Sequence, residues 1–488
     1  MGGGLNLAHA LRRSGPHAWV ASSDVQALRH WLVAGMGMML ALHGPLAGAE
    51  AWSLAGTVEA ALSANRSLIA AKLVRESEEH GLARARSEFD LKIHPSLSLG
   101  RLGGSGEDGA HHSVGVNLSK KFEIGTQLSV GPSYNQSRDD SNATLNVSLK
   151  QPLLRGLGRE EGLDGVRQAE HAVATSERRV RQANIDVALD TLALYHEAVT
   201  QHQLIALNRE IQARLVRHVL LARNKEKVGL ASPMDTYRAE IRLKDVENQV
   251  DNARHGYANA LDRLKLLINL PMTRELTLAP PVPPPWPTGD LEALAIEHRI
   301  DIAQLRADID EAQRVERLAR GRLLPDLNLV AYYGQYYTAD PYLSQSLSST
   351  QQQWSVTLQA STDLYRTAEK EALRRADLRL ETLRLSLEDR IDEVRRQVRQ
   401  ARQQLEEASN RITLRQAQIR SAEGKLALAE TKFTHDLASN FDVIEAEIEL
   451  QRARESLIVT EAARAVSLYR LWATIGLLMV EAPWKAKS

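Results

Sequence analysis

Three glycines lie close to the pattern of a nucleotide-binding loop, between a strand-like segment and a helical one. Gly156 and Gly158 fit the first two positions of the G-x-G-x-x-G pattern, in which the backbone approaches a pyrophosphate closely. Gly162 is one residue too far for the third position, and no alternation of strands and helices surrounds the segment. We therefore expect no nucleotide cofactor.

The histidines do not follow a metal-binding pattern. His196 and His202 are six residues apart, so they do not share a helix face as an i, i+4 pair would, and His111 and His112 fall in an expected loop. The 488 residues contain no HExxH motif and no cysteine, which excludes disulfides, thiolate zinc sites, cysteine nucleophiles and a lipidated N-terminal cysteine. No nucleophile with a base beside it can be nominated. We expect no metal, no other cofactor and no enzymatic activity.

Three carboxylates, Asp235, Asp442 and Glu445, lie in a segment that occurs twice. Residues 229–243 align without gaps with residues 436–450 at a constant shift of 207, and eight of the fifteen positions are identical. The alignment pairs Asp235 with Asp442, each near an expected helix start. Acids near a helix start are favoured by the helix dipole, which is the plain structural interpretation of these residues.

The repeat divides the chain into two similar halves. In each half a charged helical stretch ends at a proline, Pro95 or Pro325, that opens a strand-like run. The stretch from Pro280 to Pro287 cannot be regular helix or strand and is expected to be a stiff connector. The expected parts are a first repeat at 50–279 with strands at 96–151 and a helical tip near 228–232, a linker at 280–290, a second repeat at 291–480 with strands at 326–362 and a tip near 434–440, and a tail at 481–488.

The first 49 residues have the order of an export signal. Arg29 and His30 precede the apolar run from Trp31 to Leu42, and the small residues Ala47 to Ala49 follow it. The run is shorter than the ~20 residues that a membrane-spanning helix needs, which disfavours an anchor. We place the mature start near Glu50 and interpret residues 1–28 as an extended n-region or a misplaced start.

Two stretches have the periodicity of coiled-coil helices. Apolar residues follow alternating steps of four and three over 239–267 and 387–433, and only Arg415 interrupts the second series. A strict repeat of 3.5 residues demands a partner helix. The longer stretch alone predicts a rod of about 70 Å. An ordinary structural coiled coil would show the same pattern.

Period-two alternation with turn residues predicts antiparallel strands in both halves. Six of the eleven tyrosines lie between Tyr332 and Tyr365, with Trp354 among them, which suits either the interfacial girdle of a membrane barrel or one face of a soluble sandwich. Four to six strands cannot close a barrel of eight or more, so strands in lipid would require several chains. The expected strands are 113–119, 126–134, 144–149, 326–338 and 353–362.

Composition agrees with long helices and disfavours nucleic acid as a partner. Charged residues make up 25% and aromatic residues 5%, which is typical of long-helix proteins. Lys and Arg number 61, as do Asp and Glu, so no basic field is available to bind nucleic acid.

Taken together, the chain resembles the TolC-type outer-membrane efflux proteins. The resemblance covers about residues 52–480 and depends on the export signal, the strand ending in QPLLRGLG (Gln151–Gly158), the VGLAS turn (Val228–Ser232) between heptad helices, and the duplication. It implies a homotrimer with a twelve-strand outer-membrane barrel in lipid and a periplasmic helical tunnel. It also implies docking onto a periplasmic adaptor (membrane fusion) protein and an inner-membrane pump.

The resemblance also implies roles for individual residues. Val228, Gly229 and Leu230 match the first adaptor-docking tip, Asp436 and Leu437 lie at the second, and Asp442 and Glu445 match the acidic positions that ring the tunnel's constriction. Three copies of such carboxylates on a narrow axis would select solutes by charge. Asp235 matches a position that contacts an arginine of the neighbouring protomer.

Several residues depart from the family's pattern. The residue at the arginine's position is Ala438, which puts the inter-protomer contact of Asp235 in doubt, and Asp436 replaces the glycine of the first tip, so the second tip need not make the same turn. The segment STDLYRT (Ser361–Thr367) lacks the proline and glycines of QPLLRGLG.

Two interpretations follow. The first is a passive outer-membrane exit duct of a tripartite efflux or type I secretion system. The alternative is an exported periplasmic or surface coiled-coil scaffold without channel activity.

Overall fold

The structure is a computed structural model that describes residues 51–102, 109–136, 141–339, 347–435 and 437–485. The expected export signal at 1–49 and the mature start near Glu50 lie outside these residues. From Trp52 onward the chain forms one compact unit. The reason is that two helices of more than sixty residues each run through the unit.

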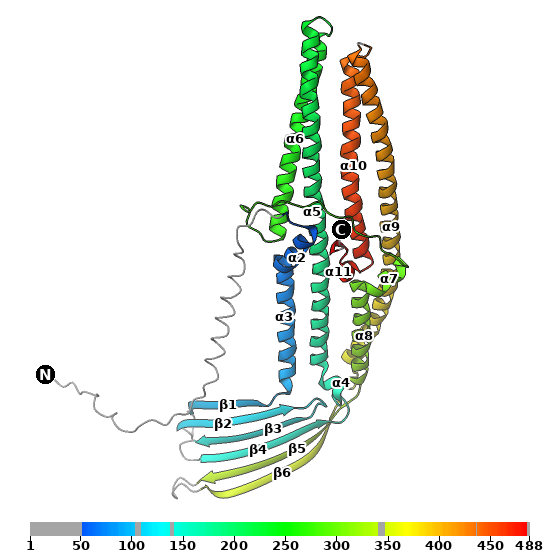
Figure 1. Ribbon diagram of the computed structural model, residues 1–488. Helices are drawn as coiled ribbons and strands as arrows, with labels where there is room; N and C mark the ends of the chain where they lie inside the picture. The colour runs from blue at the N-terminus through cyan, green and yellow to red at the C-terminus, as the bar shows by residue number, and fades with distance from the viewer. Residues whose placement is uncertain (1–50, 103–108, 137–140, 340–346, 436, 486–488) are drawn as a thin grey trace, which may run out of the picture. The chain divides into compact units, whose positions relative to one another are not determined.

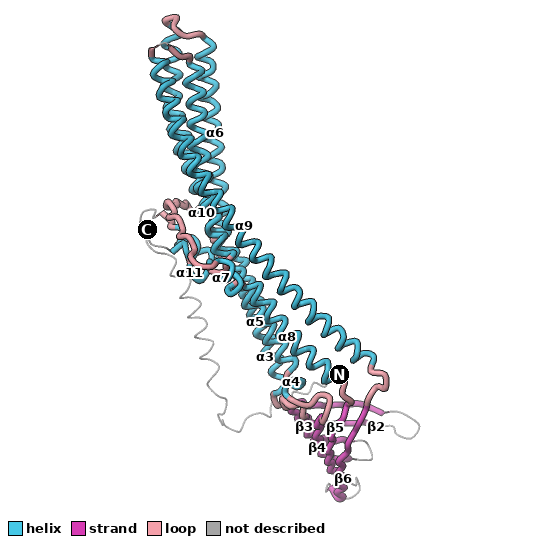
Figure 2. The backbone as a smooth tube through the Cα atoms, turned by 90° about the vertical axis from the view of Figure 1, so that its right-hand side faces the viewer, coloured by secondary structure: helices cyan, strands magenta, loops and turns pink. Residues whose placement is uncertain are grey.

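Long helices in antiparallel pairs make up most of this unit (Figures 1 and 2). The helix α5 (Asp164–Lys227) packs along α6 (Pro233–Leu267), and α9 (Thr367–Thr434) packs along α10 (Asn440–Thr474). In the described part of the chain no single helix is long and apolar enough to cross a bilayer, whereas α10 together with the segment Leu478–Lys485, bent by 109°, passes that test as a pair. The remaining helices are α2 (Leu54–Ala64), α3 (Arg66–Arg86), η1 (Ser87–Phe89), α4 (Arg159–Gly162), α7 (Leu291–His298), α8 (Ile300–Gly321), α11 (Leu478–Glu481) and η2 (Pro483–Lys485).

The predicted apolar seams are confirmed as the packed faces of α6 and α9. Every seam position in 239–267 and 387–433 is buried or half-buried, and Val246, Val394 and Leu405 are completely buried. Arg415, the polar residue in the second seam, lies half-buried, and its guanidinium donates to Gln418 on the same helix. The heptad pattern therefore identified the contact face correctly.

The largest core lies around the middle of the long helices. Tyr195 on α5 and Tyr469 on α10 are completely buried there among the apolar residues of α2, α7 and the C-terminal segment. The Tyr195 hydroxyl lies 2.8 Å from the carbonyl oxygen of Trp52 and 2.6 Å from that of Ala279. One phenol thus ties the start of the described chain and the beginning of the proline-rich stretch to α5.

Six antiparallel strands form one sheet in sequence order, β1 to β6 (Figure 1). Pro95 lies within β1 and does not open it, which a strand at the edge of the sheet tolerates. His111 and His112 lie on β2, so the expected loop there is wrong; alternating Ser, Gly and Val residues continue the strand through them. The strands are β1 (Lys92–Leu102), β2 (Gly109–Lys121), β3 (Gln127–Gln136), β4 (Ser141–Pro152), β5 (Asp326–Ala339) and β6 (Leu347–Ser361).

The register gives the sheet one apolar face and one polar face. On the apolar face Leu97 pairs with Val114, and Tyr333 pairs with Trp354, whose side chain is 75% exposed. On the polar face a row of paired residues runs across all six strands, and serine and asparagine side chains bond between strands, as in Ser129–Ser148 at 2.7 Å. That row is Lys92, Ser119, Ser129, Ser148, Tyr332 and Ser355.

The predicted aromatic cluster is divided between the two faces. Tyr333 and Trp354 lie on the apolar face, as a girdle requires, but Tyr332 and Tyr336 lie on the polar face, where their hydroxyls are 2.8 Å apart. Two consecutive tyrosines on a strand necessarily point to opposite faces.

Burial of His196 predicts a loss of stability in acid. The ring is 5% exposed and packs against Tyr195 and Tyr469, and burial lowers its pKa from 6.5 to about 4. Below pH 6.5 the unfolded chain therefore binds a proton that the folded chain does not bind until about pH 4. We expect the free energy of unfolding to fall by roughly 3 kcal/mol across this interval through His196 alone.

The measurement is unfolding of the detergent-solubilised protein, followed by circular dichroism between pH 7 and pH 4. His196→Phe should flatten the pH dependence, whereas the same change at exposed His80 should not. Equal slopes for the wild type and His196→Phe would contradict the assignment.

Candidate functional site

The first predicted tip is a tight helix ending with exposed apolar side chains. Gly229 has a φ of +78°, and its N–H donates to Glu226, while the N–H of Leu230 donates to Lys225 at 2.8 Å. These two bonds form a Schellman motif, which requires the left-handed conformation that glycine adopts without strain. Val228 and Leu230 are left 68% and 63% exposed.

The second tip ends α9 with the same long-range bond. The N–H of Leu437 donates to the carbonyl of Lys432 at 2.8 Å, the equivalent of the Leu230–Lys225 bond at the shift of 207. The second tip therefore shares this hydrogen bond with the first, despite the substitution at position 436. Leu437 is 77% exposed, and Asp436 lies outside the described residues.

Both aspartates predicted as site residues cap their own helices. The carboxylate of Asp235 accepts from the N–H and hydroxyl of Ser232, and that of Asp442 accepts from the same groups of Ser439, so each forms a capping box. The Ser439 hydroxyl and N–H, helped by Lys425 and Lys432, hold the pKa of Asp442 below its usual value. Local helix stability therefore accounts for both acids, whatever else they do.

Glu445 lies on the same hairpin as Asp442 and faces a lysine of α9. Its carboxylate is half exposed and 3.9 Å from the ammonium group of Lys425, which also pairs with Glu449 at 2.8 Å. Lys425 therefore neutralises part of the acidic patch formed by Asp442, Glu445 and Glu449. Asp235 belongs to the other hairpin and pairs only weakly with Arg238, at 3.9 Å.

The two tips are joined within the chain by residues that no sequence pattern singled out. Asn440, the first residue of α10, donates to the carbonyl of Asp235 at 2.6 Å and also contacts the His218 ring of α5. Lys225 donates to the carbonyl of Phe433 at 2.8 Å and lies over its ring. Burial lowers the pKa of His218, so its imidazole is neutral near pH 7.

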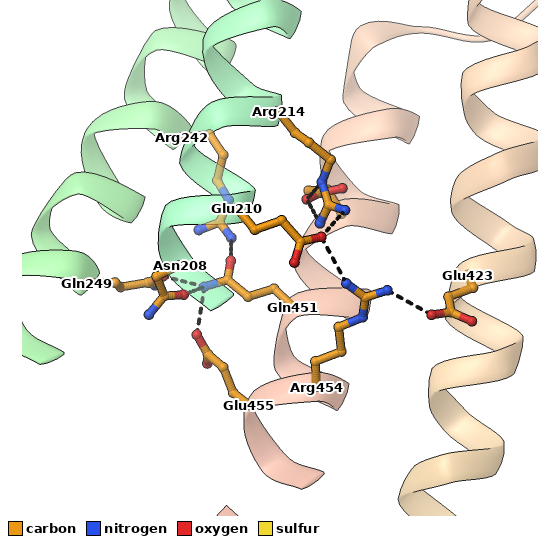
Figure 3. A network of polar contacts seen from close by, with 10 residues as sticks. Asn208, Glu210, Arg214, Arg242, Gln249, Glu423, Gln451, Arg454 and Glu455 are labelled. Atoms are coloured by element: carbon orange, nitrogen blue, oxygen red, sulfur yellow. Dashed lines mark hydrogen bonds and ion pairs between the residues drawn. The ribbon is translucent and has the colours of Figure 1, made fainter. Parts of the chain in front are cut away.

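Below the tips a buried amide links the two helical hairpins (Figure 3). Gln451 of α10 is 2% exposed, and its amide nitrogen donates to Asn208 of α5 at 3.0 Å and to Glu455 at 2.7 Å. Its carbonyl oxygen accepts from Arg242 of α6. Because both ends of one side chain are bonded to the other hairpin, a slide of either hairpin breaks several bonds at once.

A chain of ion pairs runs beside this amide (Figure 3). Arg214 of α5 pairs with Glu447 of α10 at 2.8 Å and with Glu210 at 3.0 Å. Glu210 in turn pairs with Arg454, which also reaches Glu423 of α9 at 2.8 Å. Three of the four long helices thus share one charged network.

Gly162, His196 and His202 each have a packing role in the fold. A Cβ on Gly162 would lie 1.9 Å from the carbonyl oxygen of Glu123, so this glycine lets α4 pack against the β2–β3 turn. Within the described residues, no three His, Asp or Glu side chains gather as metal ligands. His196 and His202 instead pack against tyrosine rings.

Removing Glu447 should destabilise the paired hairpins. Its carboxylate is buried, and Arg214 would keep only the exposed Glu210, so we expect Glu447→Ala to cost about 3 kcal/mol. A double-mutant cycle with Arg214→Ala, measured by urea unfolding, should give a coupling above ~1 kcal/mol. As a control, Glu407→Ala removes an exposed pair with Arg411 on α9 and should cost below ~0.5 kcal/mol. Equal costs for the two glutamates would contradict the importance of the buried network.

Comparison with known proteins finds a family match over part of the chain and a shared fold. The family described as "Outer membrane efflux protein" matches residues 291–477. The chain is 24% identical over 350 residues to the alkaline protease secretion protein AprF of Pseudomonas aeruginosa, covering 70% of this chain and 71% of that protein.

Solved structures of channels share the fold. The structure of CusC superposes with a TM-score of 0.69 at 14% identity, covering 88% of this chain and 95% of CusC. The outer-membrane channel OprN gives 0.68 at 15% identity, covering 87% and 89%. VceC of Vibrio cholerae gives 0.66 at 16% identity, covering 87% and 96%.

Proposed function

We infer that this chain, a member of the TolC-type outer membrane efflux protein family, is an outer-membrane exit duct for efflux or secretion. The single observation that carries this function is the two-faced sheet. Its apolar face is exposed over all its width, from Ile93 and Leu97 on β1 to Val356 and Leu358 on β6. A coiled-coil scaffold in water would have no use for such a face, whereas lipid covers it without cost.

We propose that three copies close the sheet into a barrel. The strands β1 and β6 are each paired on one side only, so the free edge of one copy can pair with the opposite edge of the next. Six strands per chain make eighteen for a homotrimer, not the twelve that the family resemblance implied. With strands ~4.8 Å apart and tilted by ~40°, the barrel radius is roughly 18 Å, against roughly 12 Å for twelve strands.

We also propose that the chain is an internal duplication, with the repeats at 50–279 and 291–480 separated by the linker at 280–290. The support is that equivalent residues, 207 apart, make equivalent bonds. Ser232 with Asp235 and Ser439 with Asp442 form the same capping box, and Leu230 and Leu437 close the same helix ending. The tail at 481–488 lies outside both repeats.

The tips are the proposed contact with a periplasmic adaptor, which an inner-membrane pump would energise. Val228, Leu230 and Leu437 present exposed apolar side chains at the ends of rigid helices, and Gly229 sets the turn. Asp436 belongs to the same proposed surface by its place in the sequence.

The acidic residues near the second tip are the proposed constriction. Three copies of Asp442 and Glu445 around a narrow axis would attract cations and repel anions. For Asp235 we propose a contact between protomers, through the carboxylate oxygen that faces Arg238 only at 3.9 Å.

Neutralising the constriction should change ion selectivity in a planar bilayer. Asp442→Asn keeps the oxygen acceptor for Ser439, so α10 remains capped, and Glu445→Gln keeps the side-chain size. We expect the purified protein to conduct, and the double variant to lose cation selectivity by a factor of about three at low salt. Glu407→Gln on α9 serves as the control.

Two results would count against the duct. One is a wild-type protein that shows no conductance, and the other is a mature chain that fractionates as a soluble monomer. Conductance with unchanged selectivity in the double variant would reject the constriction alone.

A charge at the tips should prevent docking without unfolding the protein. Leu230→Glu and Leu437→Glu alter only exposed side chains, so the trimer should still reach the outer membrane. We expect export to fall at least about tenfold, because desolvating two added carboxylates is costly. Leu414→Glu, on the equally exposed flank of α9, should leave export unchanged. Normal export by the tip variants would exclude these residues from the docking surface.

A further inference from the structure

Two lysines stand on the polar face of the sheet at the end where the helices join it. Lys92 is the first residue of β1, and Lys150 lies near the end of β4. The register puts them in adjacent rows: Lys92 pairs with Ser119, and Lys150 pairs with Gln127 and Val330. Both side chains are exposed and border a hollow of about 470 Å³ whose other walls include Ser129, Ser148 and Gln359.

Neither lysine has a carboxylate partner among the described residues. Three basic residues nearby along the chain do have one: Arg86 pairs with Glu170, Arg155 with Glu369 and Arg159 with Glu123. Lys120, which borders the same hollow, contacts the carbonyl oxygen of Phe89, so Lys92 and Lys150 are the ammonium groups of this hollow that have no bonded partner among the described residues.

The remaining charges around the hollow do not cancel them. Lys121 lies on the same face and is paired with Glu88 at 3.2 Å. Asp326 lies four residues before Val330 on β5, about 13 Å along the strand, and accepts from Asn328. The other described residues on the polar face include no Asp, Glu, Lys or Arg.

We propose that Lys92 and Lys150 form an anion-binding zone at the base of the barrel, which binds carboxylate or phosphate groups of passing solutes. This inference rests on the proposed function, in which the polar face lines the channel. In a trimer the zone would hold six ammonium groups, facing a constriction of opposite charge at the other end of the helices.

The width of the barrel predicts how this zone depends on salt. A lysine side chain reaches ~6 Å inward, which leaves roughly 12 Å to the axis of an eighteen-strand barrel. The screening length is about 30 Å at 0.01 M salt and about 3 Å at 1 M. The zone therefore affects every ion in the barrel at low salt and only ions that touch the wall at high salt.

The test uses channels in which Asp442 and Glu445 no longer determine the ion selectivity. In the Asp442→Asn/Glu445→Gln background we add Lys92→Gln/Lys150→Gln and measure the reversal potential in a KCl gradient. At about 0.01 M salt the ratio of chloride to potassium permeability should fall about threefold, and at 1 M it should not change. Lys92→Arg/Lys150→Arg should retain the ratio.

Lys72→Gln is the matched control. Lys72 is an exposed lysine of α3, outside the sheet and outside the residues that line the hollow, so the same loss of charge should leave the ratio unchanged. If the Lys92→Gln/Lys150→Gln channel has the same chloride-to-potassium permeability ratio as its background, the proposed anion zone is wrong, whereas the proposed duct is unaffected.

A second measurement is independent of conduction. Inorganic tripolyphosphate should bind the solubilised wild-type protein in calorimetry at low salt, and the double glutamine variant about tenfold more weakly. If the channels do not conduct, the proposed function fails, and the titration still decides the anion zone. Equal tripolyphosphate binding by both proteins would overturn it.

Discussion

The apolar face of the sheet is the constraint on which the rest of the molecule depends. Residues such as Trp354 and Val356 are too exposed to be left in water, and the helices of the same chain do not bury them. In the proposed duct, this six-stranded sheet keeps its apolar face in lipid and its polar face in water, and strands of further copies close it into a barrel. The long helices then have the task of joining this lipid-bound part to tips that end in Leu230 and Leu437.

Helices of this length need more than apolar seams to be held in place. A heptad seam is nearly invariant to a shift by one repeat, so it holds two helices together without fixing which residues meet. The polar contacts of Gln451, Arg214 and Glu447 are directional, and they can form in only one register of the helices. We interpret this network as the feature that sets the position of one hairpin against the other, at the cost of desolvating charged groups.

The periodic parts of the fold were predictable, and the specific polar contacts were not. The seams at 239–267 and 387–433 and the alternating strands repeat a simple pattern that depends on burial alone, and both are present as predicted. His111, His112 and Pro95 were misjudged because edge and polar strands tolerate residues that usually indicate loops. Asn440 and Gln451 gave no signal, since their partners on α5 and α6 are more than two hundred residues away. The capping boxes show why the role of a single acid such as Asp442 cannot be assigned from sequence. An aspartate three residues after a serine fits a helix cap and a charged ring equally well.

The unpaired sides of β1 and β6 have a consequence for biogenesis. If three copies close the barrel as proposed, each subunit carries two unpaired strand edges and an exposed apolar face until it meets its neighbours, and such edges promote aggregation of β-rich chains. In the proposed trimer, closure of the sheet is therefore more complete as subunits become more concentrated. A cell that makes this protein slowly therefore gives each copy a longer period of vulnerability to proteases, and local production near the site of insertion becomes an advantage.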